Sequence, residues 1–230
     1  MHMRKKKNRD ARLLKVDGLR VRQAEPVPAD PSVESREPAP GKVLLDESFA
    51  QKGDLYLEIG CGKGTFACET AKRTLSEDVR LLAVEMNIDA MLMAMEKCAS
   101  EGCANLKFLN INAEKLPDVL PPGSVSRIYL NFSDPWPRNR DRHRRLTSEK
   151  FLQVYRQLLA PGGDIRFKTD NRGLFDFSVE SFRQNGFDIA EITYDLHSSE
   201  WNEGNIVTEY EQKWSEKGFP IHYLRASLSQ

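Results

Sequence analysis

Residues 54–64 read DLYLEIGCGKG, and this stretch decides the fold expected for the chain. An apolar, strand-like run over 54–59 leads directly into three closely spaced glycines, the pattern of a strand that turns into a helix around a ligand. The spacing is Gly-x-Gly-x-Gly, whereas dinucleotide-binding enzymes carry Gly-x-Gly-x-x-Gly. The carboxylate of Glu58 would repel a pyrophosphate but attract the cationic amino group or sulfonium of S-adenosylmethionine. We therefore expect Glu58, Gly60, Gly62 and Gly64 to bind this cofactor; the plainer alternative is a tight turn.

Strand-like and helix-like segments alternate along the chain on both sides of this loop. The expected strands are 54–59, 80–85, 105–110, 126–132, 164–168, 187–194 and 209–214. Helical patterns lie at 65–75, at 88–95, from 147 until Pro161-Gly162-Gly163 stops the helix, and then up to about 185. This alternation predicts an α/β fold with a mostly parallel sheet covered by helices.

Two further polar residues follow strands on the cofactor side. Glu85 ends the second expected strand, where an acid can accept hydrogen bonds from both ribose hydroxyls. Asn112 comes just after the third expected strand and is placed to bind the adenine edge. Solvated strand ends are the alternative interpretation of these side chains.

Composition bounds the class of protein. With 230 residues, 40% hydrophobic and 30% charged, the chain is typical of a soluble globular domain with an extension. No apolar run approaches the roughly 18 residues that span a bilayer, and no apolar stretch follows the basic start, so we expect a cytoplasmic protein. The four cysteines form no Cys-x-x-Cys pair and lie apart from the histidines, so we expect packing thiols and no metal.

The first 42 residues differ in composition from the rest. Basic residues crowd the start, and prolines recur between 26 and 40 with few large apolar side chains. Such a segment cannot build a core, which predicts an extended or flexible N-terminal arm over 1–42 and a catalytic domain over 43–230.

A second stretch carries the chemistry of the substrate side. Residues 131–137 read NFSDPWP, and the next eight residues, 138–145, contain five arginines. The formal net charge of +0 argues against nucleic acid, but phosphate affinity depends on local positive clusters. We therefore expect the loop to contact RNA phosphates through Arg140, Arg142, Arg144 and Arg145, although charge runs are often merely solvated.

Four motifs together resemble one known family. They are SDPWP at 133–137, the arginine-rich loop running into RRLT at 144–147, KTDN at 168–171 and TEYE at 208–211. Over about residues 53–224 the chain is similar to the bacterial tRNA (guanine-N7-)-methyltransferase family, TrmB. The resemblance implies a class I S-adenosylmethionine-dependent methyltransferase fold (Rossmann-like) with a seven-stranded sheet and helices on both faces. It also implies methyl transfer to N7 of the variable-loop guanine, position forty-six, of tRNA.

The resemblance assigns roles to particular residues. Glu58, Glu85, Asn112 and Asp134 would line the cofactor site, with Asp134 also the active-site residue. The guanine or nearby RNA would be contacted by Arg138, Asp170, Thr208, Glu209, Tyr210 and Glu211. N7 of guanine carries a lone pair and no proton, so no general base is required. We therefore expect Asp134 to orient the base and stabilise its developing charge.

Several alternatives stay open at this point. Trp136 is expected either to wall the pocket or to pack in the core, Asp170 to bind substrate or to cap a helix, and 208–211 to bind substrate or to form a polar edge strand. Family positions differ at Arg138, where a lysine is usual, at Asp141, where a histidine is usual, and at Asn8, where a tryptophan is usual. These differences affect the RNA contacts.

Three other functions compete with this one. Amino-methyltransferases acting on adenine or glutamine nitrogens share a related turn, but here the second proline before the aromatic is missing. A non-catalytic RNA-binding protein on the same scaffold is disfavoured by the intact Glu58, glycine loop and Glu85. A nicotinamide-dependent dehydrogenase is disfavoured by the glycine spacing. No obligate protein partner is implied, and the chain is expected to be a monomer or a homodimer.

Overall fold

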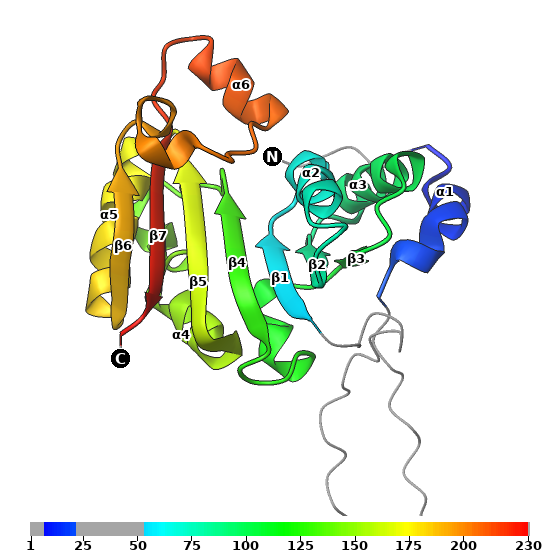
Figure 1. Cartoon of the computed structure of the whole chain (residues 1–230), viewed down its shortest axis with the longest axis horizontal. Coiled ribbons are helices and arrows are strands. Elements are labelled where there is room, and N and C mark those ends of the chain that lie inside the picture. The colour runs from blue at the N-terminus through cyan, green and yellow to red at the C-terminus, as the bar shows by residue number, and fades with distance from the viewer. Residues whose placement is uncertain (1–6, 22–52, 230) are drawn as a thin grey trace, which may run out of the picture.

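The computed structural model describes residues 7–21 and 53–229. Seven strands form one sheet in the order β3-β2-β1-β4-β5-β7-β6 (Figure 1). The strands are β1 Asp54–Ile59, β2 Val79–Val84, β3 Leu106–Leu109, β4 Val125–Asn131, β5 Leu159–Thr169, β6 Phe187–Thr193 and β7 His222–Leu228. The first five pair in parallel, whereas β7 runs antiparallel to both β5 and β6. The expected seven-stranded, mostly parallel sheet is confirmed.

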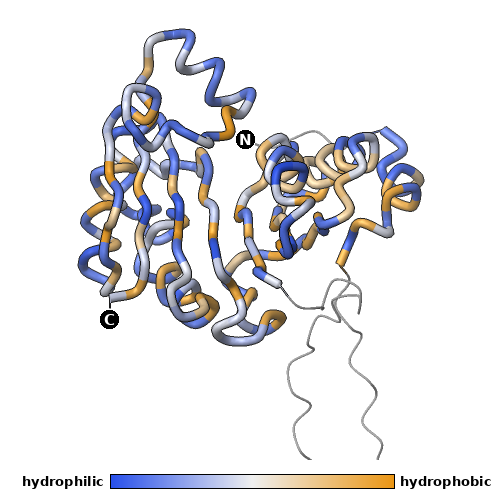
Figure 2. The backbone as a smooth tube through the Cα atoms, in the orientation of Figure 1, coloured by the Kyte–Doolittle hydropathy of each residue, from blue (hydrophilic) through white to orange (hydrophobic). Residues whose placement is uncertain are grey.

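Helices cover both faces of the sheet. They are α1 Arg9–Val16, α2 Thr65–Arg73, α3 Ile88–Glu101, α4 Glu149–Leu158, α5 Arg172–Gln184 and α6 Glu209–Ser215. Because side chains alternate along a strand, Leu55, Leu57 and Ile59 of β1 join the core formed with α4 and α5, whereas Tyr56 packs against the core formed with α1, α2 and α3. Figure 2 shows hydrophobic stretches along the strands and a mostly hydrophilic α6.

Short polar side chains begin two of the helices that start at the carboxyl ends of the strands. The side-chain Oδ1 of Asn87 accepts from the backbone amides of Asp89 and Ala90 at the start of α3. The Asn171 side chain accepts from the amide of Leu174 at the start of α5. Asn171 therefore caps α5, and the alternative that Asp170 is the cap is wrong.

The end of α4 differs slightly from the expectation. The helix ends at Leu158, and Leu159 is already extended (φ −65°, ψ 129°), so Pro161-Gly162-Gly163 lies within the start of β5. The β4–β5 register shifts between Val125 and Arg127, which accommodates this irregular start.

The expected strand over 209–214 is wrong, because this segment is the helix α6. Thr208 and Glu211 form a capping box, in which each side chain accepts from the backbone amide of the other. Tyr210 and Trp214 stand four residues apart, with their ring centroids 5.9 Å apart on one side of the helix. The seventh strand is instead β7.

Part of the expected N-terminal arm is also helical. Residues 9–16 form α1, whose Arg12 makes two hydrogen bonds to the carboxylate of Glu96 on α3. Further along, Arg20 forms an isolated parallel bridge with Phe108. The rest of the arm, including its boundary at 42, lies outside the described residues and stays a prediction. Among the helices of 7–21 and 53–229, none is long and apolar enough to cross a membrane.

Candidate active site

The site lies between β1 and β4, where the order in which strands are added to the sheet reverses. β1 and β4 are parallel neighbours, and the chain proceeds from β1 outward to β2 and β3 but from β4 outward to β5. Parallel sheets bind ligands in the crevice at the carboxyl ends of the strands at this kind of reversal. Two cavities that share Gly60 and Phe132 lie there, of about 620 and 380 Å³.

The two cavities bring together most of the residues expected from the sequence. The larger is lined by Gly60, Glu85, Asn112, Asp134, Trp136 and Arg144, among others. The smaller is lined by Glu58, the glycine loop, Thr208, Glu209 and Tyr210, among others. Residues as far apart in the sequence as Glu58 and Tyr210 therefore share one edge of the sheet, as expected for a single site.

Glu58 presents an incompletely bonded carboxylate to the smaller cavity. One oxygen, Oε1, accepts from the Asn131 amide at 3.2 Å, whereas Oε2 is buried and has no hydrogen-bond partner among the described residues. Burial raises the pKa of Glu58 to about 7, against the opposing effects of the Asn131 hydrogen bond and the Lys168 charge. A buried acceptor without a partner costs about 1–3 kcal/mol, so a ligand group that donates a hydrogen bond to Oε2 is favoured here.

The glycine loop serves both the cavity and the packing. Gly60, Gly62 and Gly64 all have positive φ (79°, 55° and 79°), which favours glycine. A Cβ on Gly64 would lie 2.6 Å from the Cβ of Ala94, so this glycine lets α2 approach α3. A Cβ on Gly62 would meet nothing within 4 Å, which leaves open space beside this part of the loop.

Backbone amides orient the carboxylate of Glu85. Its Oε2 accepts from the amide of Gly62 at 3.0 Å and its Oε1 from the amide of Asn87 at 2.8 Å. Each oxygen keeps a second lone pair for a ribose hydroxyl. Asn112 begins the short helical segment Ala113–Asp118 by accepting from the amide of Glu114 at 3.1 Å, and it lines the larger cavity.

Asp134 lies on a strained turn at the end of β4. Phe132 and Trp136, on either side of it, adopt left-handed conformations with φ 51° and 41°. Such conformations cost non-glycine residues about 1–3 kcal/mol each and persist only where the surroundings enforce them. Arg145 enforces this one: its Nε donates to the carbonyl of Pro135 at 2.9 Å and its Nη2 to that of Trp136 at 3.1 Å. The exposed Asp134 carboxylate is thereby held at the wall of the larger cavity.

Comparison with known proteins identifies the family. A family model described as a putative methyltransferase matches residues 52–224. A tRNA (guanine-N(7)-)-methyltransferase of Lachnoclostridium phytofermentans is 44% identical over 190 residues, which cover 83% of this chain and 88% of the relative. One of Bacillus subtilis is 43% identical over 185 residues, covering 80% and 85%. The chain belongs to the tRNA (guanine-N(7)-)-methyltransferase family.

The resemblance found in the motifs is thus confirmed, and the solved structures agree on the fold. The 16S rRNA methyltransferase KamB superposes with a TM-score of 0.59 at 16% identity, covering 80% of this chain and 92% of that one. This likeness supports the class I, Rossmann-like methyltransferase fold.

The arginine-rich loop, residues 138–145, contains one buried arginine, Arg145, and four exposed ones. The expectation that Arg145 contacts RNA is wrong in this geometry, because its side chain is buried over the ring of Phe177, 4.4 Å from the centroid, and holds the turn. Burial, and then the charge of Arg142, lower the pKa of Arg145. A run of charges in a sequence does not show which member turns inward.

The other arginines of the loop are exposed. Arg138, Arg140 and Arg142 lie on the surface, with Arg142 5.1 Å from the Phe177 ring centroid. The Arg144 guanidinium lies 3.5 Å from the centroid of Trp136, and both side chains line the larger cavity. Trp136 therefore walls the cavity and is half-buried, unlike a core tryptophan.

The α6 helix faces the turn that carries Asp134, but the structure does not bring Glu211 to the cavities as expected. Tyr210 packs against Phe132, with 5.1 Å between ring centroids. Burial raises the pKa of Tyr210, and the charges of Asp170 and then Asp134 raise it further, so Tyr210 lies near both carboxylates. Glu211, expected at the guanine, is fully buried and bonded instead to Lys168, Asn205 and His197.

Sequence reasoning missed the importance of Lys168 and Asn131. Lys168 stands near the end of β5 and is 4% exposed. A lysine between Phe167 and Thr169 near the end of a buried strand is itself a signal, because isolated buried charges are rare unless they are paired.

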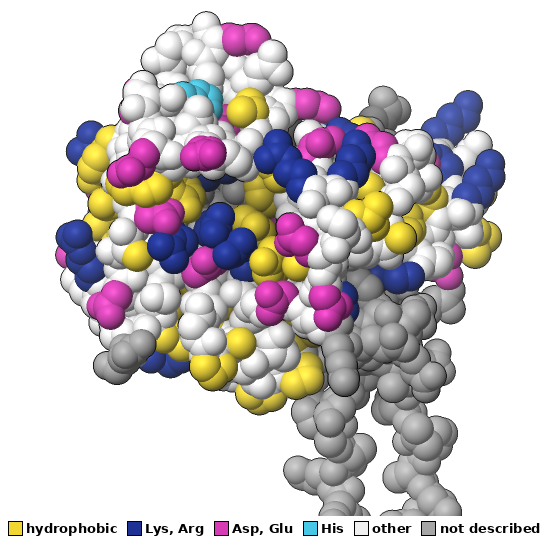
Figure 3. All heavy atoms as spheres, viewed as in Figure 1, with side chains coloured by type: hydrophobic (Ala, Val, Ile, Leu, Met, Phe, Trp, Pro, Cys, Tyr) yellow, Lys and Arg dark blue, Asp and Glu magenta, His cyan; other side chains and the backbone are white. Residues whose placement is uncertain are grey.

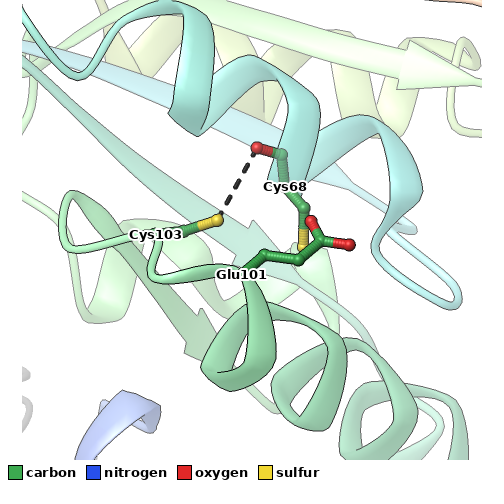
Figure 4. Close-up of side chains that lie close together, drawn as sticks. All are labelled: Cys68, Glu101 and Cys103. Atoms are coloured by element: carbon green, nitrogen blue, oxygen red, sulfur yellow. Dashed lines mark hydrogen bonds between the residues drawn. The ribbon is translucent and has the colours of Figure 1, made fainter.

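Cys68, Cys98 and Cys103 lie together away from this site, whereas Cys61 belongs to the glycine loop and lines the smaller cavity. Cys68, Glu101 and Cys103 have ligand atoms within 4.8 Å of one another (Figure 4). The Cys103 thiol donates to the carbonyl of Cys68 at 3.7 Å, and the Glu101 carboxylate lies 3.0 Å from the ammonium of Lys72. Burial raises the pKa of Cys103 to about 11, so the neutral thiol is favoured. These contacts fit the packing role expected for the thiols.

Proposed function

We propose that this chain transfers the methyl group of S-adenosylmethionine to N7 of the variable-loop guanine, position forty-six, of tRNA. The observation that carries the proposal is the arrangement across one crevice. An incompletely bonded, buried carboxylate, Glu58, lies on the cofactor side, and a rigidly held carboxylate, Asp134, lies on the substrate side. Names of relatives that act on the same base add support.

The residues present fit the cofactor. The open acceptor of Glu58 suits the cationic amino group, the two oriented oxygens of Glu85 suit the ribose hydroxyls, and Asn112 lies where an adenine edge would contact the larger cavity. When bound, the cofactor supplies an electrophilic methyl group on a sulfonium.

Asp134 selects and orients the guanine in this proposal. Its carboxylate accepts hydrogen bonds from N1–H and the exocyclic amine, a pair of donors that adenine does not offer. With the cofactor bound, N7 would form its bond to the methyl carbon with its own lone pair as the carbon–sulfur bond breaks, and the base would become cationic. The fixed negative charge stabilises that cation, and alignment of the reactants supplies about 7–11 kcal/mol of the barrier reduction.

The tRNA is held by charges at the rim of the site. Figure 3 shows Lys and Arg side chains gathered between α6 and α2, interspersed with acidic ones. The exposed Arg138, Arg140 and Arg142 follow directly after the catalytic turn and suit the phosphate backbone, while Arg144 and Trp136 form a flat wall beside the base. We place the activity in the cytoplasm, in a monomer or a homodimer without an obligate protein partner.

One assay tests the reaction and its position. The protein is incubated with labelled S-adenosylmethionine and unmodified tRNA, which is then digested to nucleosides. We expect label in 7-methylguanosine, and none when the guanine at position forty-six is replaced by adenine. Label in N6-methyladenosine or in protein would refute the proposal. Cofactor binding without any transfer would favour a binding module.

A further inference from the structure

The proposed chemistry leaves one buried ion pair unused. The ammonium of Lys168 lies 2.7 Å from Oε2 of Glu211, and the two side chains are 5% and 0% exposed. Lys168 belongs to β5 and Glu211 to α6, so the pair joins the central sheet to the helix above the cavities.

All the hydrogen bonds of the Lys168 ammonium reach the segment that leads into α6. Besides Glu211, it donates to Oδ1 of Asn205 at 2.8 Å and to the carbonyl of Ile206 at 3.0 Å. On the other side, Oε1 of Glu211 is within 2.8 Å of the Asn205 amide and 2.9 Å of Nε2 of His197. Both charges are thus fully bonded, as a buried pair requires.

The ion pair is the fully buried attachment of α6. Glu211 is the one buried residue of this helix, so the helix has no fully buried apolar side chain to anchor it. A short, hydrophilic helix is not stable on its own in water. Its position therefore depends on its few contacts, of which the bonds of Glu211 to Lys168, Asn205 and His197 are the buried ones.

What α6 positions is part of the wall of the smaller cavity, which Glu209 and Tyr210 line. Tyr210 precedes Glu211 and lies against Phe132 of the catalytic turn, near the charges of Asp134 and Asp170. The Lys168 ammonium also lies 5.7 Å from the Phe132 ring centroid, so the same side chain contacts both the turn and the tether.

We propose that Lys168 and Glu211 are positioning residues, which hold α6 so that Tyr210 forms the wall of the guanine site opposite Asp134. Glu211 acts through Tyr210 and touches no RNA. This inference rests on the proposed function, because it names the part of the molecule that shapes its substrate site.

A double-mutant cycle separates this role from direct RNA contact. Glu211→Gln, Tyr210→Ala and the double variant of the full-length chain are compared with the parent by kcat/KM for unmodified tRNA. Each single change is expected to lower kcat/KM by about tenfold, with Glu211→Gln adding less than about twofold in the Tyr210→Ala background. Glu216→Gln, an exposed acid just after α6, is the matched control and should stay within about twofold. Reductions that multiply in the double variant would overturn the inference.

A milder variant covers the case in which Glu211→Gln does not fold. Asn205→Ala removes hydrogen bonds to both members of the pair without stranding a buried charge. We expect a reduction of about threefold in kcat/KM that disappears in the Tyr210→Ala background. An unchanged kcat/KM in the otherwise native chain would overturn the inference. If the parent chain forms no 7-methylguanosine, the proposed function fails and the inference fails with it; if it does form this product and the reductions multiply, only the inference fails.

Discussion

The two halves of the crevice are built differently. On the cofactor half, the backbone does most of the positioning: Glu85 is oriented by two backbone amides, and the glycine loop follows directly from β1. On the half proposed to bind guanine, individual side chains do this work: Arg145 bonds to the turn that carries Asp134, and Glu211 of α6 pairs with Lys168. Replacing a side chain next to the cofactor half should therefore have a small effect on cofactor binding. Replacing one side chain on the other half, even far from the base, should reduce activity toward tRNA.

The largest effect should come from removing the charge opposite the base. Asp134→Asn keeps the shape of the side chain, and we expect kcat to fall by about 10²–10³-fold because the transition state is no longer stabilised by a fixed negative charge. The dissociation constant of S-adenosylmethionine, measured by calorimetry, should change by less than about threefold, since the contacts of Glu58 and Glu85 persist. Near-normal turnover would show that Asp134 has no electrostatic role.

Replacing Arg145 should have the next largest effect, and it should act by destabilising the fold. Arg145→Ala leaves two carbonyl groups of the turn without their donor, and we expect the free energy of unfolding to drop by about 2–3 kcal/mol, with a marked decrease of kcat. Denaturant unfolding and steady-state kinetics measure the two quantities. The matched control is Arg140→Ala, an exposed arginine of the same loop, which should change stability by less than about 0.5 kcal/mol. Equal effects of the two replacements would argue against a turn-holding role.

The affinity for S-adenosylmethionine should depend on pH through the carboxylate of Glu58. Because burial raises the pKa of Glu58 to about 7, this carboxylate is protonated below pH 7 and no longer attracts a cationic amino group. The affinity for S-adenosylmethionine should fall by up to about tenfold for each pH unit below 7, and Glu58→Gln should bind weakly with little pH dependence. The folded-state pKa exceeds the unfolded one, so the same group favours folding as the pH falls from 7 towards 4.5. Calorimetric titrations between about pH 5.5 and 8 measure this affinity. A pH-independent affinity in the parent chain would contradict the role assigned to Glu58.

The smallest effects should come from the exposed arginines. Replacing Arg138, Arg140 or Arg142 with alanine should weaken tRNA binding a few-fold, because each removes one positive charge from the rim of the site. The slope of log K against log salt should become shallower by roughly 0.7–0.9 for each phosphate that is no longer neutralised. Filter binding at several salt concentrations measures this slope. Arg183→Ala on the exposed end of α5 should leave it unchanged, and an equal effect there would indicate nonspecific charge attraction.

The same contrast explains which parts the sequence could predict. Glu58, the glycine loop and Glu85 were predictable because strand ends and local glycine spacing place them directly. The helix α6 was missed because its signals are a capping box and one aromatic pair, which alternate in polarity much as a short strand does. The inward turn of Arg145 and the burial of Glu211 depend on partners 9–10 and 43 residues away, and residue type alone favours the surface for both. The helix α1 depends likewise on its contacts with α3, such as that between Arg12 and Glu96.

The strand order also bears on how the protein is made. β6 joins the sheet only through β7, and β5 has its outer edge covered by β7 alone, yet β7 follows every other strand of the described chain. A nascent chain emerging from the ribosome therefore carries an open edge on β5 until residues 222–228 appear, and an uncovered strand edge is a template for association with other chains. Ribosome-bound intermediates that stop short of β7 are the species most in need of chaperone protection.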